Sequence, residues 1–189
     1  MDPLVNIAED RARARVANDP MAALCVLATV GAGGYPQART LVLRDLNERL
    51  ALFMNATSPK FQQLDAGASI CMYMPSIQVQ YRAQVDLVPI DPALIAESWQ
   101  LRPRMPKVLD WFYTHRQVQS STVSSREALQ AAIAEFPLPE PLIAPDTARG
   151  FYLELHDIER LDLAQPDGLH NRNRWVKNES RWVLSTLLP

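Results

Sequence analysis

The chain has 189 residues, 48% of them hydrophobic and 21% charged, which suits one ordinary globular domain and excludes wholesale disorder. Its net charge of -2 argues against a general nucleic-acid-binding protein, because such proteins usually carry a basic surplus. The N-terminus lacks the apolar segment of a signal peptide, and the longest apolar run, about ten residues, is too short to cross a membrane. We therefore expect a cytoplasmic protein that binds neither membrane nor nucleic acid.

The first predicted element is a polar helix over residues 3–18, an arm that leads into the domain. Its "RARAR" segment is expected to face solvent, as charge runs on helices usually do. The apolar run "MAALCVLATV" (21–30) predicts a buried strand that ends at the turn "GAGGYP". Cys25 in this run and Cys71 in a later one are expected to be buried free thiols, since their spacing gives neither a disulfide framework nor a metal signature.

A meander of two strands comes next. "QARTLVLRD" (37–45) alternates between two faces, and residues 50–56 return after a short loop. Ser58 and Pro59 then suit the N-cap and the first position of a short helix.

Two further strands are predicted over residues 68–75 and 77–89. The second has a strict period of two, which gives it one buried face and one polar face. Its apolar positions are Val79, Tyr81, Ala83, Val85 and Leu87, and its polar positions are Gln78, Gln80, Arg82, Gln84 and Asp86.

Helices are predicted over residues 91–102 and 106–116, and a third follows the capping box "SSRE" (124–127). A proline-rich connector then leads to a strand at 150–163 and a hairpin at 174–187. Because many strands follow one another without an intervening helix, we expect a mainly β protein with some α structure. The pattern favours a twisted antiparallel barrel with peripheral helices.

Sequence motifs leave few options for chemistry. The chain has no GxGxxG, P-loop or HExxH motif, and His115, His156 and His170 lack a spacing suited to zinc, so no metal site is expected. Cations, amides and hydroxyls instead stand at the ends of predicted elements. They are Arg39, Arg44, Lys60, Gln80, Arg102, Gln119, Ser120, Ser121, Arg172 and Arg174. Lys60 opposes the dipole of the short helix unless an anion shares the site, although a plain surface lysine is the alternative.

An ordered series of segments carries a family resemblance. The segments are "DPMAALCVLATVGAGGYPQARTLVLRDL", "LFMNATSPKFQQL", "QLRPR", "QVQSS", "LHNRNRW" and the terminal "LLP". From about Asp19 to Pro189 the chain resembles the pyridoxamine 5′-phosphate oxidase family. The resemblance implies an FMN-binding split β-barrel over residues 1–189. It also implies a homodimer with the flavin at the interface, in which residues 150–189 complete the dimer and the active site.

The resemblance also implies roles for individual residues. Arg39 and Lys60 would hold the FMN phosphate with help from Gln119 and Ser120, and Arg172 would contact the flavin. The remaining residues expected at the cofactor are Thr40, Leu41, Val42, Leu43, Arg44, Phe53, Met54 and Gln80. The residues expected at a small phosphorylated substrate are Arg44, Ser98, Arg102 and His170, with His170 facing the reacting ring as the catalytic candidate. The alternative for His170 is a structural loop histidine.

Several positions depart from the family pattern, mostly on the substrate side. Arg44 replaces a lysine, Ser98 a tyrosine and Pro106 a serine, while Pro59 replaces a basic residue. Gly168 stands where an arginine usually covers the substrate. In addition, Leu161 or Asp162 occupies the place of a flavin-stacking tryptophan.

Three functions are consistent with these residues. The first is an FMN-dependent oxidase that converts pyridoxamine or pyridoxine 5′-phosphate to pyridoxal 5′-phosphate in vitamin B6 salvage, with O2 consumed and H2O2 released. The second is a related oxidase of a different ring substrate, such as a phenazine precursor. The third is a flavin- or vitamer-binding protein without turnover. A nucleic-acid-binding barrel is disfavoured by the net charge.

Overall fold

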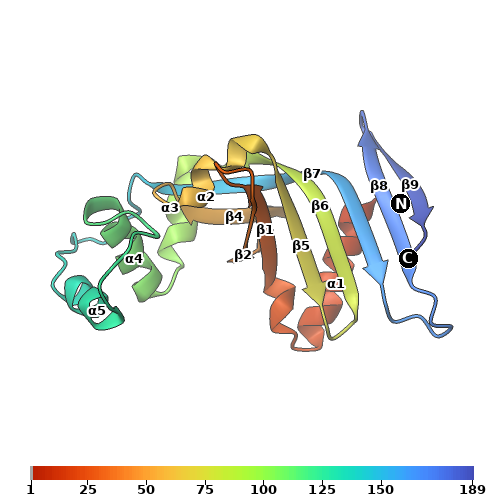
Figure 1. Cartoon of the computed structure of the whole chain (residues 1–189), viewed down its shortest axis with the longest axis horizontal. Coiled ribbons are helices and arrows are strands. Elements are labelled where there is room, and N and C mark those ends of the chain that lie inside the picture. Colours follow the sequence, from red (N-terminus) through yellow and green to blue (C-terminus); the bar gives the residue numbers. More distant parts are fainter. Residues whose placement is uncertain (1) are drawn as a thin grey trace. The chain divides into compact units, whose positions relative to one another are not determined.

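The structure is a computed structural model that describes residues 2–189 (Figure 1). The chain divides into two compact units. The first contains the described residues up to Leu52 together with Leu64–Val88 and Leu153–Pro189, and the second contains Phe53–Gln63 and Pro89–Tyr152. The interpretation of residues 1–189 as a single domain stays a prediction.

The first unit is mainly sheet, with one long helix. Its elements are α1 (Pro3–Val16), the 3-10 turn η1 (Pro20–Ala23), β1 (Leu24–Val30), β2 (Pro36–Val42), β3 (Arg44–Leu46), the 3-10 turn η2 (Leu64–Ala66), β5 (Ala68–Met74), β6 (Val79–Pro89), β8 (Asn171–Asn178) and β9 (Arg181–Leu187). Among the described residues, β4 (Arg49–Asn55) and β7 (Ala148–Asp162) contribute residues to both units, as β6 does with its last residue, Pro89. The leading helix and the C-terminal strands therefore form where the sequence predicts them.

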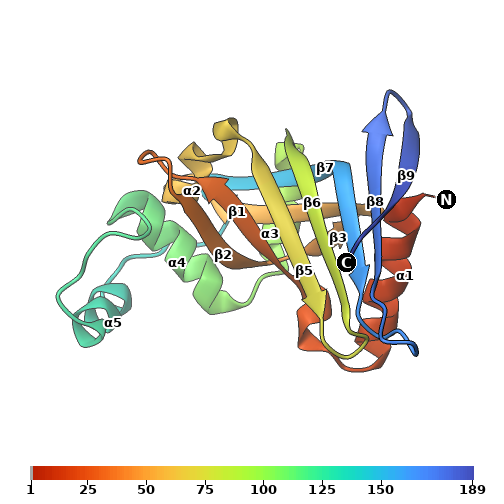
Figure 2. The same ribbon diagram turned by 45° about the vertical axis from the view of Figure 1, so that its right-hand side comes forward.

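The strands form one nine-stranded sheet in the order β2-β1-β5-β6-β7-β4-β3, with β8 beside β7 and β9 beside β8. The pairs β1–β2, β1–β5, β3–β4, β5–β6, β7–β8 and β8–β9 are all antiparallel. Figures 1 and 2 show β8 and β9, coloured dark blue, as a hairpin that continues the sheet from β7. The prediction of a mainly β protein with an antiparallel sheet is confirmed.

Alternation in β6 follows the predicted period of two. Val79, Tyr81, Ala83 and Val85 are each at most 3% exposed, whereas Arg82 and its polar neighbours lie on the other face. One face of the strand therefore belongs to the core, because successive side chains in a strand point to opposite sides.

The strand predicted at 37–45 is interrupted. β2 ends at Val42 and β3 begins at Arg44, with the buried Leu43 between them. The break occurs because β2 pairs with β1 whereas β3 pairs with β4, so the chain changes neighbours at this point. The Leu43 N–H donates to the carbonyl of Ala23 at 2.9 Å, which holds the junction against the start of β1.

The prediction that the arginines of α1 face solvent is wrong for Arg11, whose side chain is only 2% exposed. Its Nε donates to the Ala22 carbonyl at 3.0 Å and its Nη2 to the Leu43 carbonyl at 3.3 Å, and it forms an ion pair with Asp45. A guanidinium has five donors, so it can be buried where backbone carbonyls and a carboxylate accept them. Arg13, at 62% exposure, remains on the solvent side.

A buried polar cluster fixes α1 to the sheet. The Tyr81 hydroxyl on β6 donates to Asp10 Oδ2 at 2.7 Å, and Arg160 Nε on β7 donates to the same oxygen at 2.8 Å. Burial raises the pKa of Asp10, but the hydrogen bonds from Arg160 and Tyr81 outweigh it, so the pKa lies below its ordinary value. Asp10 is therefore a carboxylate in the core, paired with a guanidinium.

The second unit is mainly helical. Besides parts of β4 and β7 it contains α2 (Pro59–Gln62), α3 (Pro92–Gln100), α4 (Arg104–His115) and α5 (Arg126–Ala134). The predicted capping box from Ser124 to Glu127 is wrong by one residue. Ser125 is the N-cap, because its backbone is extended and its Oγ accepts the Ala128 N–H at 3.1 Å.

The two cysteines differ in their surroundings. Cys25 is 2% exposed, and burial raises the pKa of its thiol to about 12. The expectation of a buried thiol is wrong for Cys71, which is only half-buried because it lies on the face of β5 opposite to the core residues Ile70 and Met72. Among the helices of residues 2–189, none has the length and apolar character needed to span a membrane.

We predict that Tyr81→Phe lowers the free energy of unfolding by about 1.5–3 kcal/mol, because the charged Asp10 acceptor stays buried and loses a donor. Urea denaturation measures this change. Tyr73→Phe is the matched control, since Tyr73 is 40% exposed on the neighbouring strand and should change stability by less than about 0.5 kcal/mol. Equal effects of the two substitutions would contradict a stabilising role for the cluster.

Candidate functional site

The residues predicted at the site fall into two groups, one in each unit. The first unit contains Arg39, Thr40, Leu41, Val42, Leu43, Arg44, Gln80, His170 and Arg172, and the second contains Phe53, Met54, Lys60, Ser98, Arg102, Gln119 and Ser120.

Arg39 lies on β2 opposite Leu27 of β1. Its Nη1 donates to the Thr29 hydroxyl at 2.6 Å and to the Leu27 carbonyl at 3.3 Å. Burial lowers the pKa of this guanidinium below its ordinary value. The side chain is thus held against the sheet at a half-buried position.

β2 stands at one end of the sheet, and within residues 2–189 no strand pairs with its outer edge. Thr40 and Val42 are exposed, and Leu41 is half-buried. An unpaired strand edge presents N–H and C=O groups that can bind a planar polar group. This suits the prediction that residues 39–44 meet the flavin through their backbone.

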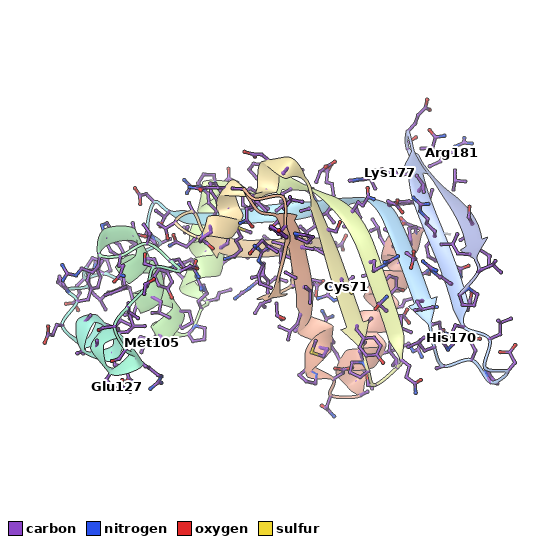
Figure 3. The ribbon with its side chains drawn as sticks, in the orientation of Figure 1. Cys71, Met105, Glu127, His170, Lys177 and Arg181 are labelled. Atoms are coloured by element: carbon purple, nitrogen blue, oxygen red, sulfur yellow. The ribbon has the colours of Figure 1, made fainter. Side chains whose placement is uncertain are left out.

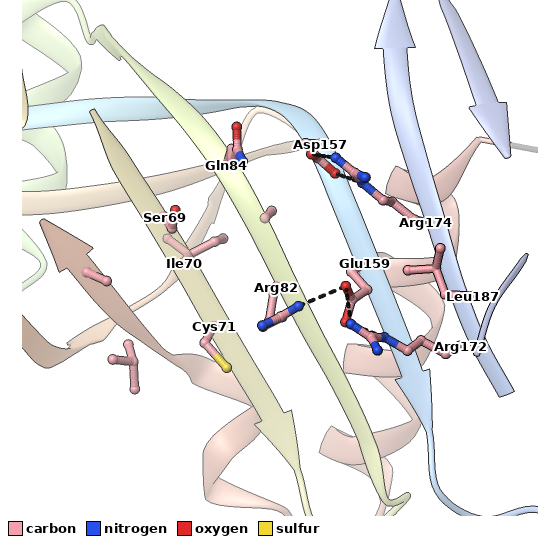
Figure 4. Close-up of a pocket in the computed structure, with 13 residues that line it drawn as sticks. Ser69, Ile70, Cys71, Arg82, Gln84, Asp157, Glu159, Arg172, Arg174 and Leu187 are labelled. Atoms are coloured by element: carbon pink, nitrogen blue, oxygen red, sulfur yellow. Dashed lines mark hydrogen bonds and ion pairs between the residues drawn. The ribbon is translucent and has the colours of Figure 1, made fainter. Parts of the chain in front are cut away.

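A cavity of about 530 Å³ lies on the sheet face opposite to the core of the first unit. Charged residues from three strands line it: Arg82 (β6), Asp157 and Glu159 (β7), and Arg172 and Arg174 (β8). Figure 4 shows the dashed contacts that join them. Three arginines against two carboxylates leave one positive charge in excess, which suits an anionic or electron-rich ligand.

Glu159 joins two of these arginines. Arg172 donates from Nε and Nη2 to its two carboxylate oxygens, both at 3.0 Å, and Arg82 Nη2 donates at 2.8 Å. Burial raises the pKa of Glu159, but the hydrogen bonds from Arg172 and Arg82 outweigh it, so the net shift is downward. The bidentate pair fixes the plane of the Arg172 guanidinium. Gln80, two residues before Arg82 on β6, is on the same face of the strand.

His170 is exposed and immediately precedes β8, in the connection from β7 that Figure 3 shows. Gly168 has a φ of 74°, and a Cβ there would meet nothing within 4 Å. Gly168 therefore does not share an extended strand with His170 and Arg172, because a left-handed residue belongs to a turn. The place that an arginine usually occupies is therefore open space beside a turn.

In the second unit, the turn before α2 lies beside the loop after α4. The Gln119 N–H donates to the Thr57 hydroxyl at 3.3 Å, and Lys60 Nζ donates to the Ser58 hydroxyl at 2.6 Å. Ser120 has a φ of 71°, a strained value for a residue other than glycine. The structure thus brings together Lys60, Gln119 and Ser120, three of the four predicted phosphate contacts.

The argument from the dipole of α2 is weakened by the structure. The helix has four residues, and the Ser58 side chain makes no capping hydrogen bond. One turn aligns too few peptide units for a substantial dipole. If an anion binds here, the Lys60 charge and the surrounding donors must attract it.

Asn55, which the sequence does not single out, organises this turn. Its Oδ1 accepts the Thr57 N–H at 2.9 Å, and its Nδ2 donates to the Thr147 hydroxyl at 3.0 Å and the Asp110 carbonyl at 3.3 Å. The residue is 4% exposed. The only sequence signal was an amide directly after an apolar strand.

Arg102, predicted at the substrate phosphate, forms an ion pair with Asp110 on α4. The Trp99 indole N–H donates to the same carboxylate at 2.8 Å. Asp110 is 6% exposed, and an acid in the apolar segment "KVLDWF" was the signal that could have identified it. Ser98 is buried on α3 at 9% exposure. On β4, Phe53 is half-buried and Met54 is 7% exposed.

Sequence comparison places the chain among known proteins. Residues 9–137 match the family model described as pyridoxamine 5′-phosphate oxidase. The chain is 28% identical to a pyridoxine/pyridoxamine 5′-phosphate oxidase of Anaeromyxobacter dehalogenans, over 100% of this chain and 96% of the relative. It is 30% identical to the protein of the same name from Myxococcus xanthus, over 100% and 92%.

Two solved structures share the fold. PhzG from Burkholderia lata, solved with tetrahydrophenazine-1-carboxylic acid, matches with a TM-score of 0.83 and 26% identity over 100% of this chain and 93% of its own. A pyridoxamine 5′-phosphate oxidase-related, FMN-binding protein from Nostoc punctiforme matches with a TM-score of 0.79 and 21% identity, over 100% and 99%. The predicted split-barrel class is thereby confirmed.

We predict that Asn55→Leu destabilises the protein by about 1–3 kcal/mol, because the Thr57 N–H loses its acceptor in a buried turn. Urea denaturation gives the total, and hydrogen exchange should show faster exchange of the Thr57 amide. Asn171→Leu, at an exposed position of β8, is the matched control. Unchanged protection of the Thr57 amide would refute the role assigned to Asn55.

Proposed function

Since the chain belongs to the pyridoxamine 5′-phosphate oxidase family, we propose that it is an FMN-dependent oxidase of pyridoxamine or pyridoxine 5′-phosphate. The products are pyridoxal 5′-phosphate and hydrogen peroxide, with dioxygen as the electron acceptor; with pyridoxamine 5′-phosphate, water is also consumed and ammonia released. The observation that carries the proposal is the grouping of Lys60, Gln119 and Ser120 around Thr57, at positions that the family resemblance assigns to the FMN phosphate.

The donors present in each unit fit FMN. Around Thr57, an ammonium, a side-chain amide and hydroxyls offer charge-assisted hydrogen bonds to a phosphate, each contributing about 1.5–3 kcal/mol. On the sheet, Arg39 supplies a second cation, and the outer edge of β2 supplies backbone groups for the ring. We assign Phe53, Met54 and Gln80 to the same cofactor.

When bound, FMN supplies the hydride acceptor for the carbon that carries the amine or hydroxyl. The protein binds and orients the substrate. Arg44 and Arg102 bind its phosphate with Ser98 nearby, and His170 faces the pyridine ring. Since Arg102 is also paired with Asp110, its guanidinium is held in position before a substrate arrives.

The homodimer implied by the family is part of this proposal. The cavity lined by Arg172 and Arg174 opens on a charged face of the sheet, and a second protomer can cover this face. In such a dimer the C-terminal strands complete the active site, and the flavin lies at the interface.

The decisive assay incubates the purified protein with FMN and, separately, pyridoxamine 5′-phosphate, pyridoxine 5′-phosphate and a reduced phenazine carboxylic acid. We expect hydrogen peroxide and pyridoxal 5′-phosphate in equal amounts from the two vitamers. Peroxide from the phenazine alone would identify the alternative oxidase. Flavin binding without peroxide from any of the three compounds would leave the non-catalytic alternative.

We predict that Lys60→Met weakens FMN binding by about 10- to 150-fold, the equivalent of one lost charge-assisted hydrogen bond. Quenching of flavin fluorescence on binding measures the dissociation constant. Lys177→Met, at an exposed position of β8, removes the same charge elsewhere and should leave the constant unchanged. Full affinity in Lys60→Met would exclude the phosphate contact.

A further inference from the structure

Arg11 of α1 holds the chain on both sides of Arg44. We propose that Arg11 is a positioning residue that orients Arg44 toward the phosphate of the substrate, and so determines the preference for phosphorylated substrates. The inference rests on the proposed function, in which Arg44 contacts that phosphate.

The first part of the argument is the backbone before Arg44. Arg11 Nη2 donates to the Leu43 carbonyl at 3.3 Å, and this carbonyl belongs to the peptide group that ends at the Arg44 nitrogen. The other side of Leu43 is fixed as well, because its N–H donates to the Ala23 carbonyl at 2.9 Å. The peptide plane that leads into Arg44 is thus bound directly by a buried guanidinium.

The second part is the residue after Arg44. Asp45 forms ion pairs with both Arg11 and Arg15, which draws its side chain toward α1. Because neighbouring side chains on a strand point to opposite faces, Arg44 at the start of β3 must project away from α1. Its register opposite Ala51 of β4 fixes it along the strand.

The third part is the burial of the clamp. The Arg11 side chain is 2% exposed, and its Nε is occupied by the Ala22 carbonyl at 3.0 Å. A buried guanidinium with three partners has little freedom to move, so it is a rigid support rather than a surface ion pair. Two of its partners, Leu43 and Asp45, flank Arg44 in the chain. Their placement there makes α1 a support for the predicted phosphate contact.

The test compares ligands that differ only in the phosphate. Calorimetric titration of the FMN-loaded protein with 4′-deoxypyridoxine 5′-phosphate and with 4′-deoxypyridoxine gives a phosphate preference, and neither probe can be oxidised at C4′. We expect Arg11→Met and Asp45→Asn each to reduce this preference about tenfold by weakening the phosphorylated probe alone. Asp45→Asn keeps the side-chain shape at a half-exposed position and serves if Arg11→Met does not fold.

Arg13→Met is the matched control, because Arg13 is on the same helix but pairs with Asp10 and not with a neighbour of Arg44; it tests general effects on α1 and should keep the preference. When Arg11→Met or Asp45→Asn is added to Arg44→Met, the preference should fall no further, because Arg11 and Asp45 act through the contact of Arg44 with the phosphate. If Arg44→Met loses the preference while Arg11→Met and Asp45→Asn keep it, the positioning role is overturned. An unchanged preference in Arg44→Met overturns the proposed phosphate contact, and the positioning role with it. Equal weakening of both probes shows a purely structural effect and also overturns the proposal.

Discussion

The candidate site depends on one constraint: buried backbone groups at the end of a strand need hydrogen-bond partners from outside the sheet. At the break between β2 and β3 the Arg11 guanidinium bonds the Leu43 carbonyl, and it also bonds the Ala22 carbonyl of η1. A buried backbone group without a partner costs about as much as a lost hydrogen bond. The break at Leu43, where the chain passes from pairing with β1 to pairing with β4, is therefore tolerated because α1 lies beside it. The Asp10, Tyr81 and Arg160 cluster holds α1 in that place.

In the second unit, a side-chain amide supplies the hydrogen bonds that the backbone needs at the end of a strand. β4 ends at Asn55, and the side chain of that residue takes over the bonding of the turn that follows. Its two other bonds reach Thr147 and α4, so one buried side chain links three segments that are distant in sequence. Asp110 is a second buried side chain of this kind, because its carboxylate pairs with Arg102 and accepts a hydrogen bond from the Trp99 indole. In each unit, polar residues predicted for the site are supported by buried polar residues that the prediction did not include.

These supporting contacts explain which features could be predicted from the sequence and which could not. The period of two in β6, the apolar run of β1 and the proline-rich connector predicted their structures because local patterns decide them. The candidate site residues were identified from the ordered series of segments that resembles the family. The roles of Arg11, Asn55 and Glu159 were missed because most of their partners lie between 11 and 92 residues away, on elements that only the fold brings near. A run of charges on a helix predicts a solvent-exposed face, and only the tertiary packing shows that Arg11 is buried.

The break in alternation at Gly168 bears on how the substrate would be covered. In a strand, an arginine two residues before His170 would share its side, whereas the left-handed turn at Gly168 ends that relation. A side chain added there would find space but would adopt an unfavourable backbone conformation. The turn therefore disfavours an arginine at this position through its backbone conformation. The cavity on the sheet carries an excess positive charge, from Arg82, Arg172 and Arg174 against two carboxylates, which would attract an anionic ligand to that face.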